Sequence, residues 1–331
     1  MFYKKLNRNI QCTLCPHMCV LHEGKVGLCG VRQNLGGHIK CRVSGIVSGY
    51  TFDPIEKKPL YHFYPGKKIL SVGSYGCNLN CNFCQNWQIS KAFQLENIAS
   101  KPKTANSIVE QALSRPDNIG VAYTYNEPTV WFEFMYDVAL KIKNSGLKNV
   151  MVSNGYINQE PLEKLLEVID AFNIDLKAFT DSFYHDMVGG SLQPVLESLK
   201  TISKHKKHLE ITNLVIPGKN DDIGQFKEMV NWIRSELGAN TVLHISRYFP
   251  NYKQALPPTL EGVIIQMSEI AKQKLNFVYV GNMQSAKHST TNCPKCHSEL
   301  IRRNGYLVEF TKNYGGASCL KCNYKLPICI T

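Results

Sequence analysis

The chain has 331 residues, 44% of them hydrophobic, which is enough to bury one large core with small appendages. It contains no run of about 18 apolar residues and no apolar signal core near its start, so we expect a cytoplasmic protein without a membrane span. Its formal net charge of +12 favours acidic partners; nucleic acid is one candidate, and a generally basic solvated surface is the alternative.

The chain holds 13 cysteines, which in a protein of this size fit metal ligands in a reducing compartment better than disulfides. Eleven of them fall into three groups: Cys12, Cys15, Cys19 and Cys29; Cys77, Cys81 and Cys84; and Cys293, Cys296, Cys319 and Cys322. The two left over, Cys41 and Cys329, are interpreted as buried or incidental thiols.

The first group predicts a small metal-bound lid over residues 1–45. Its spacing, C-x2-C-x3-C-x9-C, supplies a complete set of four metal ligands. An iron–sulfur cluster and zinc both fit; the spacing favours a cluster, because zinc knuckles usually come as two pairs. Alternating residues in 38–52 predict a hairpin from the lid to the core. Three prolines in 53–66 make the connector over 46–68 extended.

Strands and helices alternate over residues 69–283. Strands are predicted at 69–73, 119–123, 149–153, 172–176, 209–216, 241–245 and 277–280. Helices are predicted at 129–144, 159–169, 192–205, 222–237 and 259–275. This alternation requires parallel strands with right-handed crossovers, so we expect an α/β fold, a partial (β/α)6-type barrel. In such barrels the chemistry collects at the carboxyl ends of the strands.

The second cysteine group, spaced C-x3-C-x2-C, follows the first of these strands. A strand that runs into a compact cysteine loop can place three thiolates, those of Cys77, Cys81 and Cys84, around one face of an iron–sulfur cube. Such clusters normally take four thiolates, so one iron stays open for a ligand that is not protein. A zinc knuckle or chance clustering is the alternative, but zinc sites prefer paired C-x2-C units.

This spacing resembles that of radical S-adenosylmethionine (SAM) enzymes. The resemblance implies that the amino and carboxylate groups of SAM chelate the open iron of a 4Fe–4S cluster. It implies that an electron from the cluster then cleaves SAM to methionine and a 5′-deoxyadenosyl radical. Phe83, the aromatic residue before the last cysteine, matches a family position near the adenine. The cluster needs an electron donor, for which an acidic ferredoxin or flavodoxin suits the basic chain.

Further polar residues follow the second and third strands. Asn126 and Glu127 stand where the family has a Gly-Gly-Glu-Pro segment that contacts the SAM amino group. Glu127 can equally cap the helix that begins at Pro128. Ser153 and Asn154 resemble the Thr-Asn-Gly segment of glycyl-radical-enzyme activases, where polar groups line the SAM site. A plain turn at the end of the strand is the alternative.

The fourth and sixth strands carry the remaining candidates for SAM contacts. Asp175 and Lys177 match the activases' Asp-x-Lys segment, and strand alternation puts both side chains on one face. The resemblance implies that Lys177 holds the SAM carboxylate; a buried ion pair is the alternative. His244 shares a face with Ser246 and is predicted to reach adenosine, unless it is a hydrogen-bonded core histidine.

The third cysteine group predicts a zinc-ribbon or rubredoxin-like tail over residues 284–331, with zinc or iron as its metal. It consists of two C-x2-C knuckles, Cys293/Cys296 and Cys319/Cys322. Between the knuckles, residues 300–303 and 306–310 are predicted to form the two strands of a hairpin.

Taken together, the segments resemble one group within the pyruvate formate-lyase activase-like proteins, the radical SAM member of the AmmeMemoRadiSam system. The resemblance rests on residues 12–19, 29–32, 53–63, 76–79, 84–87 and 279–282. It implies AMMECR-like and Memo-like partners. Two enzymatic functions compete: hydrogen abstraction from an unidentified substrate, and installation of a glycyl radical on a partner protein. A non-catalytic module that binds metal or nucleic acid is the third possibility.

Overall fold

The computed structural model describes residues 1–98, 101–283 and 286–330, so the boundary predicted at residue 284 lies outside the described residues. One eight-stranded sheet, in the order β13-β12-β11-β10-β9-β8-β7-β6, forms its centre. The strands are β6 (Gly49–Pro54), β7 (Lys68–Gly73), β8 (Asn118–Tyr123), β9 (Lys148–Ser153), β10 (Ala171–Asp175), β11 (His208–Val215), β12 (Val242–Arg247) and β13 (Phe277–Gly281). Strands β7 to β13 are mutually parallel, and β13 does not pair with β6. The predicted partial barrel is therefore confirmed.

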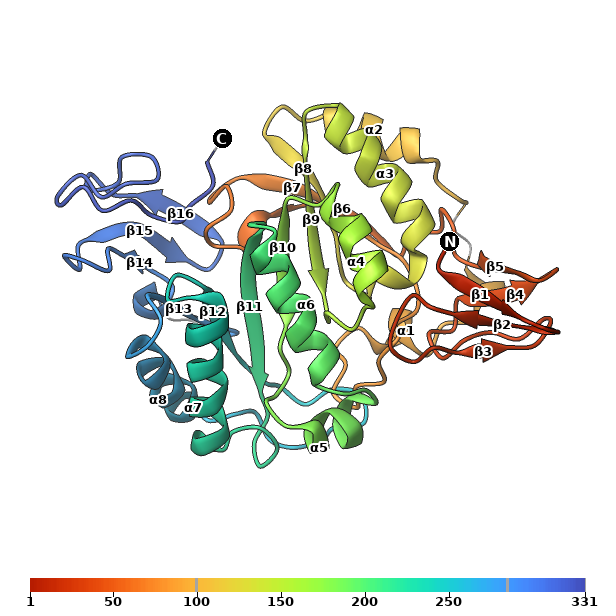
Figure 1. The fold of residues 1–331 in the computed structure, drawn as a ribbon. Coiled ribbons are helices and arrows are strands. Elements are labelled where there is room, and N and C mark those ends of the chain that lie inside the picture. Colours follow the sequence, from red (N-terminus) through yellow and green to blue (C-terminus); the bar gives the residue numbers. More distant parts are fainter. Residues whose placement is uncertain (99–100, 284–285, 331) are drawn as a thin grey trace.

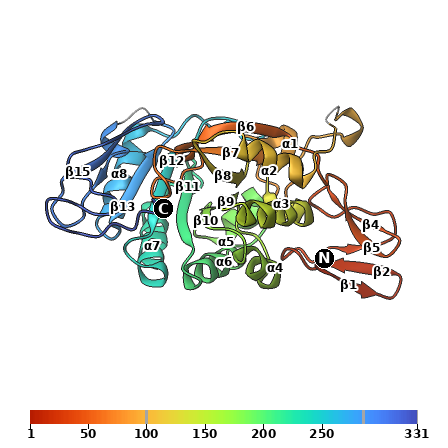
Figure 2. The same ribbon diagram turned by 90° about the horizontal axis from the view of Figure 1, so that it is seen from above.

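Amphipathic helices cover the outer face of this sheet, as the alternating pattern predicts (Figure 2). The longer helices are α2 (Ala105–Leu113), α3 (Phe132–Asn144), α4 (Gln159–Leu166), α6 (Gln193–Lys204), α7 (Ile223–Trp232) and α8 (Glu261–Lys272). Helix α7 begins at a sequence-encoded cap, because the Asp222 carboxylate accepts a hydrogen bond from the Gln225 N–H at 2.8 Å. It continues into a π-helical turn, η5 (Ile233–Leu237).

Shorter helical turns lie in the connections. They are η1 (Ile55–Lys57), α1 (Trp87–Ser90), η2 (Leu95–Asn97), η3 (Pro128–Trp131), α5 (Asp181–Phe183), η4 (Tyr184–Val188) and η6 (Ala286–His288). Two of them follow directly on residues of the candidate site: α1 comes after the second cysteine group, and η3 begins next to Glu127.

Much of the connector after the lid is part of the barrel: it supplies an edge strand of the sheet and packs on the other strands. The predicted hairpin within 38–52 is wrong: residues 38–41 pair with β4, and residues 49–54 form β6, the antiparallel edge strand against β7. Beyond β6, the buried side chains of Ile55, Leu60 and Phe63 pack on Ala122, Val150 and Ala171. These apolar contacts fix the connector to the barrel strands.

The lid consists of two small antiparallel sheets. They are formed by β1 (Tyr3–Leu6), β2 (Asn9–Cys12) and β3 (Val20–Leu21), and by β4 (Arg32–Leu35) and β5 (His38–Cys41). Asn158, just after β9, fixes the lid to the carboxyl side of the barrel. Its backbone N–H donates to the Leu14 carbonyl at 3.1 Å, and its side chain donates to the Thr13 carbonyl at 2.8 Å.

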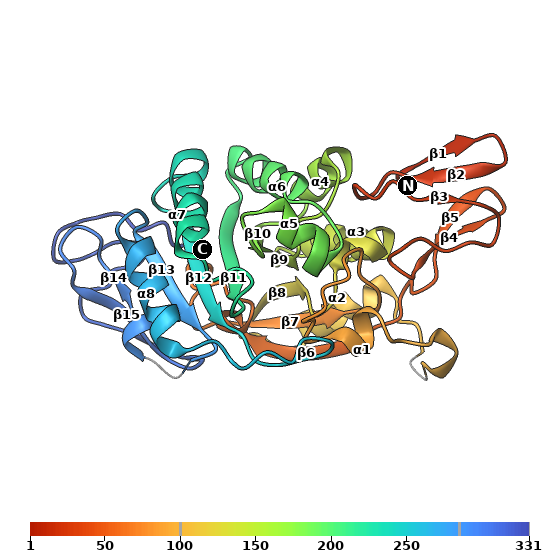
Figure 3. The ribbon, with the colours of Figure 1, turned by 90° about the horizontal axis from the view of Figure 1, so that it is seen from below.

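The tail folds as a three-stranded sheet of β14 (Thr291–Asn292), β15 (Glu299–Asn304) and β16 (Leu307–Phe310), which confirms the predicted hairpin. Figures 1 and 3 show the lid and the tail at opposite ends of the molecule. The buried Arg303 joins the tail to the connector by donating to the Tyr61 carbonyl at 2.6 Å. No helix within the described residues is long and apolar enough to cross a membrane.

Candidate active site at the carboxyl ends of the strands

The loop that carries Cys77, Cys81 and Cys84 follows β7 and is held by polar side chains rather than by its own cysteines. The Asn126 side chain accepts a hydrogen bond from the Ser74 N–H at 3.0 Å and donates to the Gly76 carbonyl at 2.8 Å. Gly76 itself has a φ of +87°, and a Cβ there would lie 2.7 Å from the Cys29 carbonyl oxygen. Glycine is therefore required where this loop turns against the lid.

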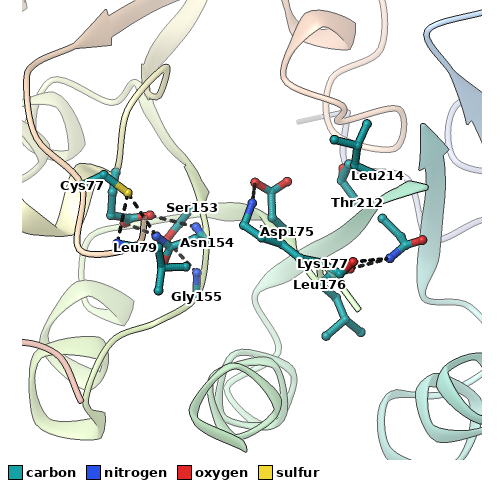
Figure 4. A network of polar contacts seen from close by, with 12 residues as sticks. Cys77, Leu79, Ser153, Asn154, Gly155, Asp175, Leu176, Lys177, Thr212 and Leu214 are labelled. Carbon is teal, nitrogen blue, oxygen red and sulfur yellow. Dashed lines mark hydrogen bonds and ion pairs between the residues drawn. The ribbon is translucent and has the colours of Figure 1, made fainter. Parts of the chain in front are cut away.

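Two more asparagines, Asn78 and Asn154, fix the start of the loop, and Figure 4 shows Asn154 beside Cys77. The Asn78 amide donates to the Tyr156 carbonyl at 2.6 Å. The Asn154 amide donates to Asn78 Oδ1 at 2.9 Å and lies 3.7 Å from the sulfur of Cys77. The Lys91 ammonium donates to the carbonyl of Cys77 at 2.8 Å. A positive charge and amide N–H groups beside a sulfur favour its thiolate form.

The three thiols lie in an environment that suits a bound metal centre. Burial raises the pKa of the Cys81 thiol to about 11, against the lowering effect of the Lys177 ammonium. Burial raises the pKa of Cys77 as well. Buried thiols of this kind become thiolates when a metal supplies the compensating charge, because a coordinating thiol is deprotonated outright.

Across the barrel end, Asp175 and Lys177 form an ion pair of 3.0 Å at the end of β10 (Figure 4). The Lys177 side chain is 15% exposed, whereas that of Asp175 is 38% exposed, so the pair opens toward solvent on its acidic side. Burial alone would lower the pKa of Lys177, but the neighbouring Asp175 carboxylate and the Cys81 sulfur raise it. The Lys177 nitrogen lies 6.0 Å from the centre of the Phe83 ring, next to the cysteine loop.

Glu127 connects the ends of β8 and β9. Its buried carboxylate accepts hydrogen bonds from the Thr129 N–H at 3.1 Å and the Thr129 hydroxyl at 3.0 Å. It also accepts from the Ser153 hydroxyl at 2.9 Å and from the Asn154 N–H at 2.8 Å. The expected helix cap is thus present, since Glu127 precedes Pro128 at the start of η3. The same contacts orient Asn154 toward Cys77.

The structure places His244 apart from this group, inside the barrel. Its Nε2 lies 2.6 Å from a carboxylate oxygen of Glu210, and the rings of Tyr61 and Tyr279 pack against it. Only 2% of its surface is exposed. His244 is therefore a buried, hydrogen-bonded histidine of the barrel core, which is the alternative considered for it, and its contact with adenosine stays a prediction.

In the tail, the four cysteine sulfurs come together as a single-ion site. All four lie within 4.8 Å of one another. The sulfurs of Cys293 and Cys322 are 3.5 Å apart, and those of Cys296 and Cys319 are 3.6 Å apart. A tetrahedral ion with metal–sulfur distances of about 2.3 Å places its sulfurs roughly 3.8 Å apart. The tail cysteines therefore fit the predicted zinc-ribbon-like site.

We expect one zinc ion per tail, and we expect Cys296→Ser to lose it. Zinc counted per chain by mass spectrometry, together with zinc–sulfur distances near 2.3 Å from X-ray absorption, checks this result. Cys41→Ser, which changes a cysteine outside all three groups, is the matched control and should keep the zinc. A disulfide-linked tail, or a folded tail without metal, would refute the expectation.

Comparison with known proteins identifies the family. A family model described as "Radical SAM superfamily" matches residues 71–233, which begin within β7 and include the cysteine loop and the strand ends described above. The chain therefore contains a radical SAM domain. It is 42% identical over 306 residues to an uncharacterized protein of Methanocaldococcus jannaschii, covering 92% of this chain and 90% of that protein, and it belongs to the same family.

One curated relative and one solved structure are also similar to parts of the chain. Over 182 residues the chain is 25% identical to the pyruvate formate-lyase 1-activating enzyme of Escherichia coli, covering 52% of this chain and 74% of that enzyme. The fold matches a radical SAM methyltransferase from Sphaerobacter thermophilus with a TM-score of 0.52 and 15% identity, covering 66% of this chain and 67% of that structure. At that identity the structural match shows the fold alone.

The radical SAM domain implies a 4Fe–4S cluster and SAM, and the three half-buried thiols in the loop after β7 fit such a cluster. Sequence reasoning found most of the polar residues around them but missed Asn78 and Lys91. Asn78 lies inside the cysteine loop, so its position was the available signal. Lys91 follows α1, and nothing in the pattern indicated that its ammonium reaches the Cys77 carbonyl.

Proposed function

We propose that this radical SAM protein cleaves SAM reductively and abstracts hydrogen from a substrate. The observation that carries the proposal is the pairing of two features at one end of the barrel: the loop of Cys77, Cys81 and Cys84, and the Asp175–Lys177 pair beside Phe83. The formation of 5′-deoxyadenosine from SAM under anaerobic reduction tests it. The less favoured reading, a non-catalytic module that binds metal or nucleic acid, leaves this combination unexplained.

In this proposal the three cysteines hold three irons of the cluster and leave the fourth iron for SAM. The cluster and SAM, when bound, supply the electron and the 5′-deoxyadenosyl radical of the reaction. Asn126 and Asn78 hold the loop in position through backbone hydrogen bonds, so its geometry does not depend on metal alone. Glu127 orders the β8 and β9 ends and directs Asn154 toward the sulfur of Cys77.

Lys177 is assigned to the SAM carboxylate. Its ammonium donates to one carboxylate, that of Asp175, and has further N–H groups that can donate to a second carboxylate. Lys177→Ala should weaken SAM binding by about 2 kcal/mol or more, roughly 30-fold in Kd, because the ligand carboxylate loses its partner in a partly buried site. Calorimetry under anaerobic conditions measures this affinity.

Two control variants accompany Lys177→Ala. Lys177→Arg keeps the charge and should retain part of the affinity. Lys200→Ala removes an exposed lysine that pairs with Glu197 on helix α6, and it should leave SAM binding unchanged. An unaltered affinity in Lys177→Ala would show that Lys177 only neutralises Asp175.

A second candidate function is the activation of a partner enzyme by a glycyl radical. It is favoured by two activating enzymes among the relatives, that of pyruvate formate-lyase from Escherichia coli and that of benzylsuccinate synthase from Thauera aromatica, the latter 24% identical over 184 residues. A glycyl-radical doublet on a co-expressed candidate partner, seen by electron paramagnetic resonance (EPR), would select this function. Its absence with every glycyl-radical enzyme of the host would reject it.

The partners belong to the same proposal. We propose a cytoplasmic, reducing setting, an acidic ferredoxin or flavodoxin as electron donor, and association with AMMECR-like and Memo-like proteins through the AmmeMemoRadiSam system. The net charge of +12 supports the acidic donor. Co-purification of the chain with each candidate protein tests these associations.

A further inference from the structure

We propose that Cys12, Cys15, Cys19 and Cys29 bind a second iron–sulfur cluster, rather than zinc, and that this cluster passes electrons to the radical site. The first argument is sulfur spacing. Among the described residues, the tail cysteines form the only group whose sulfurs all lie within 4.8 Å, as one zinc ion requires. The lid cysteines form no such group, and neither do Cys77, Cys81 and Cys84. Thiolates that bind separate irons of a cube stand farther apart than thiolates around one ion.

The second argument is the cavity that the lid cysteines share. All four line one cavity, whose remaining wall is largely apolar and includes Leu14, Leu21 and Val130. Leu14 and Leu21 are 2% and 4% exposed, so water is kept from this side of the site. Low solvent access around a cluster is one of the features by which a protein sets its reduction potential.

The third argument is an unpaired donor in the wall of the same cavity. Arg32 is 2% exposed and donates through its two terminal nitrogens to Glu133 at 2.8 and 3.0 Å. Its buried Nε–H has no partner at hydrogen-bond distance, although the guanidinium lies close to the Cys12 thiol. A buried donor without a partner is costly, and an anionic, thiolate-bound cluster would satisfy it. The side chain of Arg32 thus fits a negatively charged group in this cavity.

A hydrogen bond joins the lid site to the radical site. His17, two residues after Cys15, has its Nε2 2.7 Å from the carbonyl oxygen of Asn78, which follows Cys77. Asn78 also lines the lid cavity. The carbonyl of Cys29 lies against Gly76 on the other side of Cys77. An electron can therefore pass from the lid to Cys77 through bonded atoms and one hydrogen bond.

The outer side of the lid site offers an entry for the electron. Cys29 also lines a surface pocket together with Arg42 and Lys91. Leu28 is 66% exposed at the same place. Glu96 lines the same pocket and lies 4.0 Å from Arg42, so the two cations leave a net positive rim around an exposed apolar residue, which suits an acidic one-electron carrier. In each transfer the reduced carrier loses one electron, the lid cluster gains it, and the cluster at Cys77 receives it; this last destination rests on the proposed function.

Metal counting in the full chain tests the cluster. In a Cys77→Ala/Cys81→Ala/Cys84→Ala variant purified without oxygen, we expect about four irons per chain, one zinc from the tail, and an EPR signal on reduction. The wild type should hold about eight irons. Two zincs and no iron in the variant would overturn the inference. If the variant does not fold, a wild type with about four irons and two zincs overturns it equally.

The relay is tested with His17→Phe, which keeps an aromatic ring beside Tyr156 but removes the hydrogen bond to Asn78. Reduced flavodoxin should lose its rapid reduction of the radical-site cluster, while dithionite still reduces it. His22→Phe, an exposed histidine of the same lid, is the control. Equal rates in both variants would overturn the relay. A chain with two clusters that never cleaves SAM would refute the proposed function and leave the lid cluster standing.

Discussion

Replacing Cys77, Cys81 and Cys84 together with alanine is expected to abolish SAM cleavage and to remove about four irons per chain. The reason is that these three cysteines supply the loop after β7, whereas the remaining cysteines belong to the lid, to the tail or to isolated positions. The zinc of the tail should stay, because its four ligands lie at the other end of the molecule (Figure 1).

The triple variant should still fold, which keeps this prediction interpretable. The loop is held by Asn126 and Asn78, and by backbone bonds from Asn80 to Val188 at 2.7 Å and from Asn82 to Met187 at 3.1 Å. Circular dichroism and the melting temperature check the fold. Cys41→Ser is again the control and should keep full activity. Continued formation of 5′-deoxyadenosine in the triple variant would show that the radical chemistry lies elsewhere.

Glu210→Ala is expected to cause the largest loss of stability. The carboxylate of Glu210 is completely buried and lies 2.9 Å from Nε2 of His208 and 2.6 Å from Nε2 of His244. It also accepts hydrogen bonds from the backbone N–H groups of Tyr61 and His62, at 3.0 and 2.7 Å. Removal leaves four buried polar groups without an acceptor, which should cost about 3–5 kcal/mol in the free energy of unfolding.

Urea unfolding measures the effect. Glu197→Ala, which removes an exposed carboxylate that pairs with Lys200, should change stability by less than about 1 kcal/mol. Glu210→Gln should fall between the two, because it keeps one acceptor oxygen but loses the charge. A Glu210→Ala chain as stable as the wild type would show that the connector and β12 do not depend on this carboxylate.

The same cluster gives stability a pH dependence with a definite sign. Burial alone would lower the pKa of His208, but hydrogen bonds with Cys329 and Glu210 raise this pKa from 6.5 to about 9. Protonated His208 therefore contributes to the stability of the folded chain. That contribution is full below pH 6.5 and is lost as the pH rises through 9. Burial alone would raise the pKa of Glu210, but His208 and His244 hold it well below 4.5. Its contribution is present above pH 4.5 and is lost as the pH falls. Both contributions are present together between pH 4.5 and 6.5.

The barrel could be predicted from the sequence because its strands are buried on both faces and read as short apolar runs between amphipathic helices. Val121, Ile174 and Ile211, for example, are almost completely buried in β8, β10 and β11. The tail was predictable for a different reason: two C-x2-C pairs are the usual ligand set of a single zinc ion, and the four sulfurs do lie together.

The features that the sequence did not predict depend on which strands pair and on how far along the barrel a side chain lies. The alternation of apolar and polar residues defines neither. Alternation in residues 38–52 indicates strands but does not indicate which strands they pair with. Strand β6 pairs with β7, whereas β5 pairs with β4. For His244, alternation gives the face of the strand but not how far the side chain lies from the cofactor. Glu210 lies on β11, the strand next to His244 on β12. Only the register between β11 and β12 brings its carboxylate to His244.

The most direct measurement of the central claim is the amount of 5′-deoxyadenosine and methionine formed from SAM by the anaerobically reconstituted wild-type chain under reduction, run beside the Cys77/Cys81/Cys84 alanine variant. Our account predicts that the wild type forms both products in equal amounts and that the variant forms neither. A wild-type chain that carries its irons, binds SAM and yet releases no 5′-deoxyadenosine would contradict it.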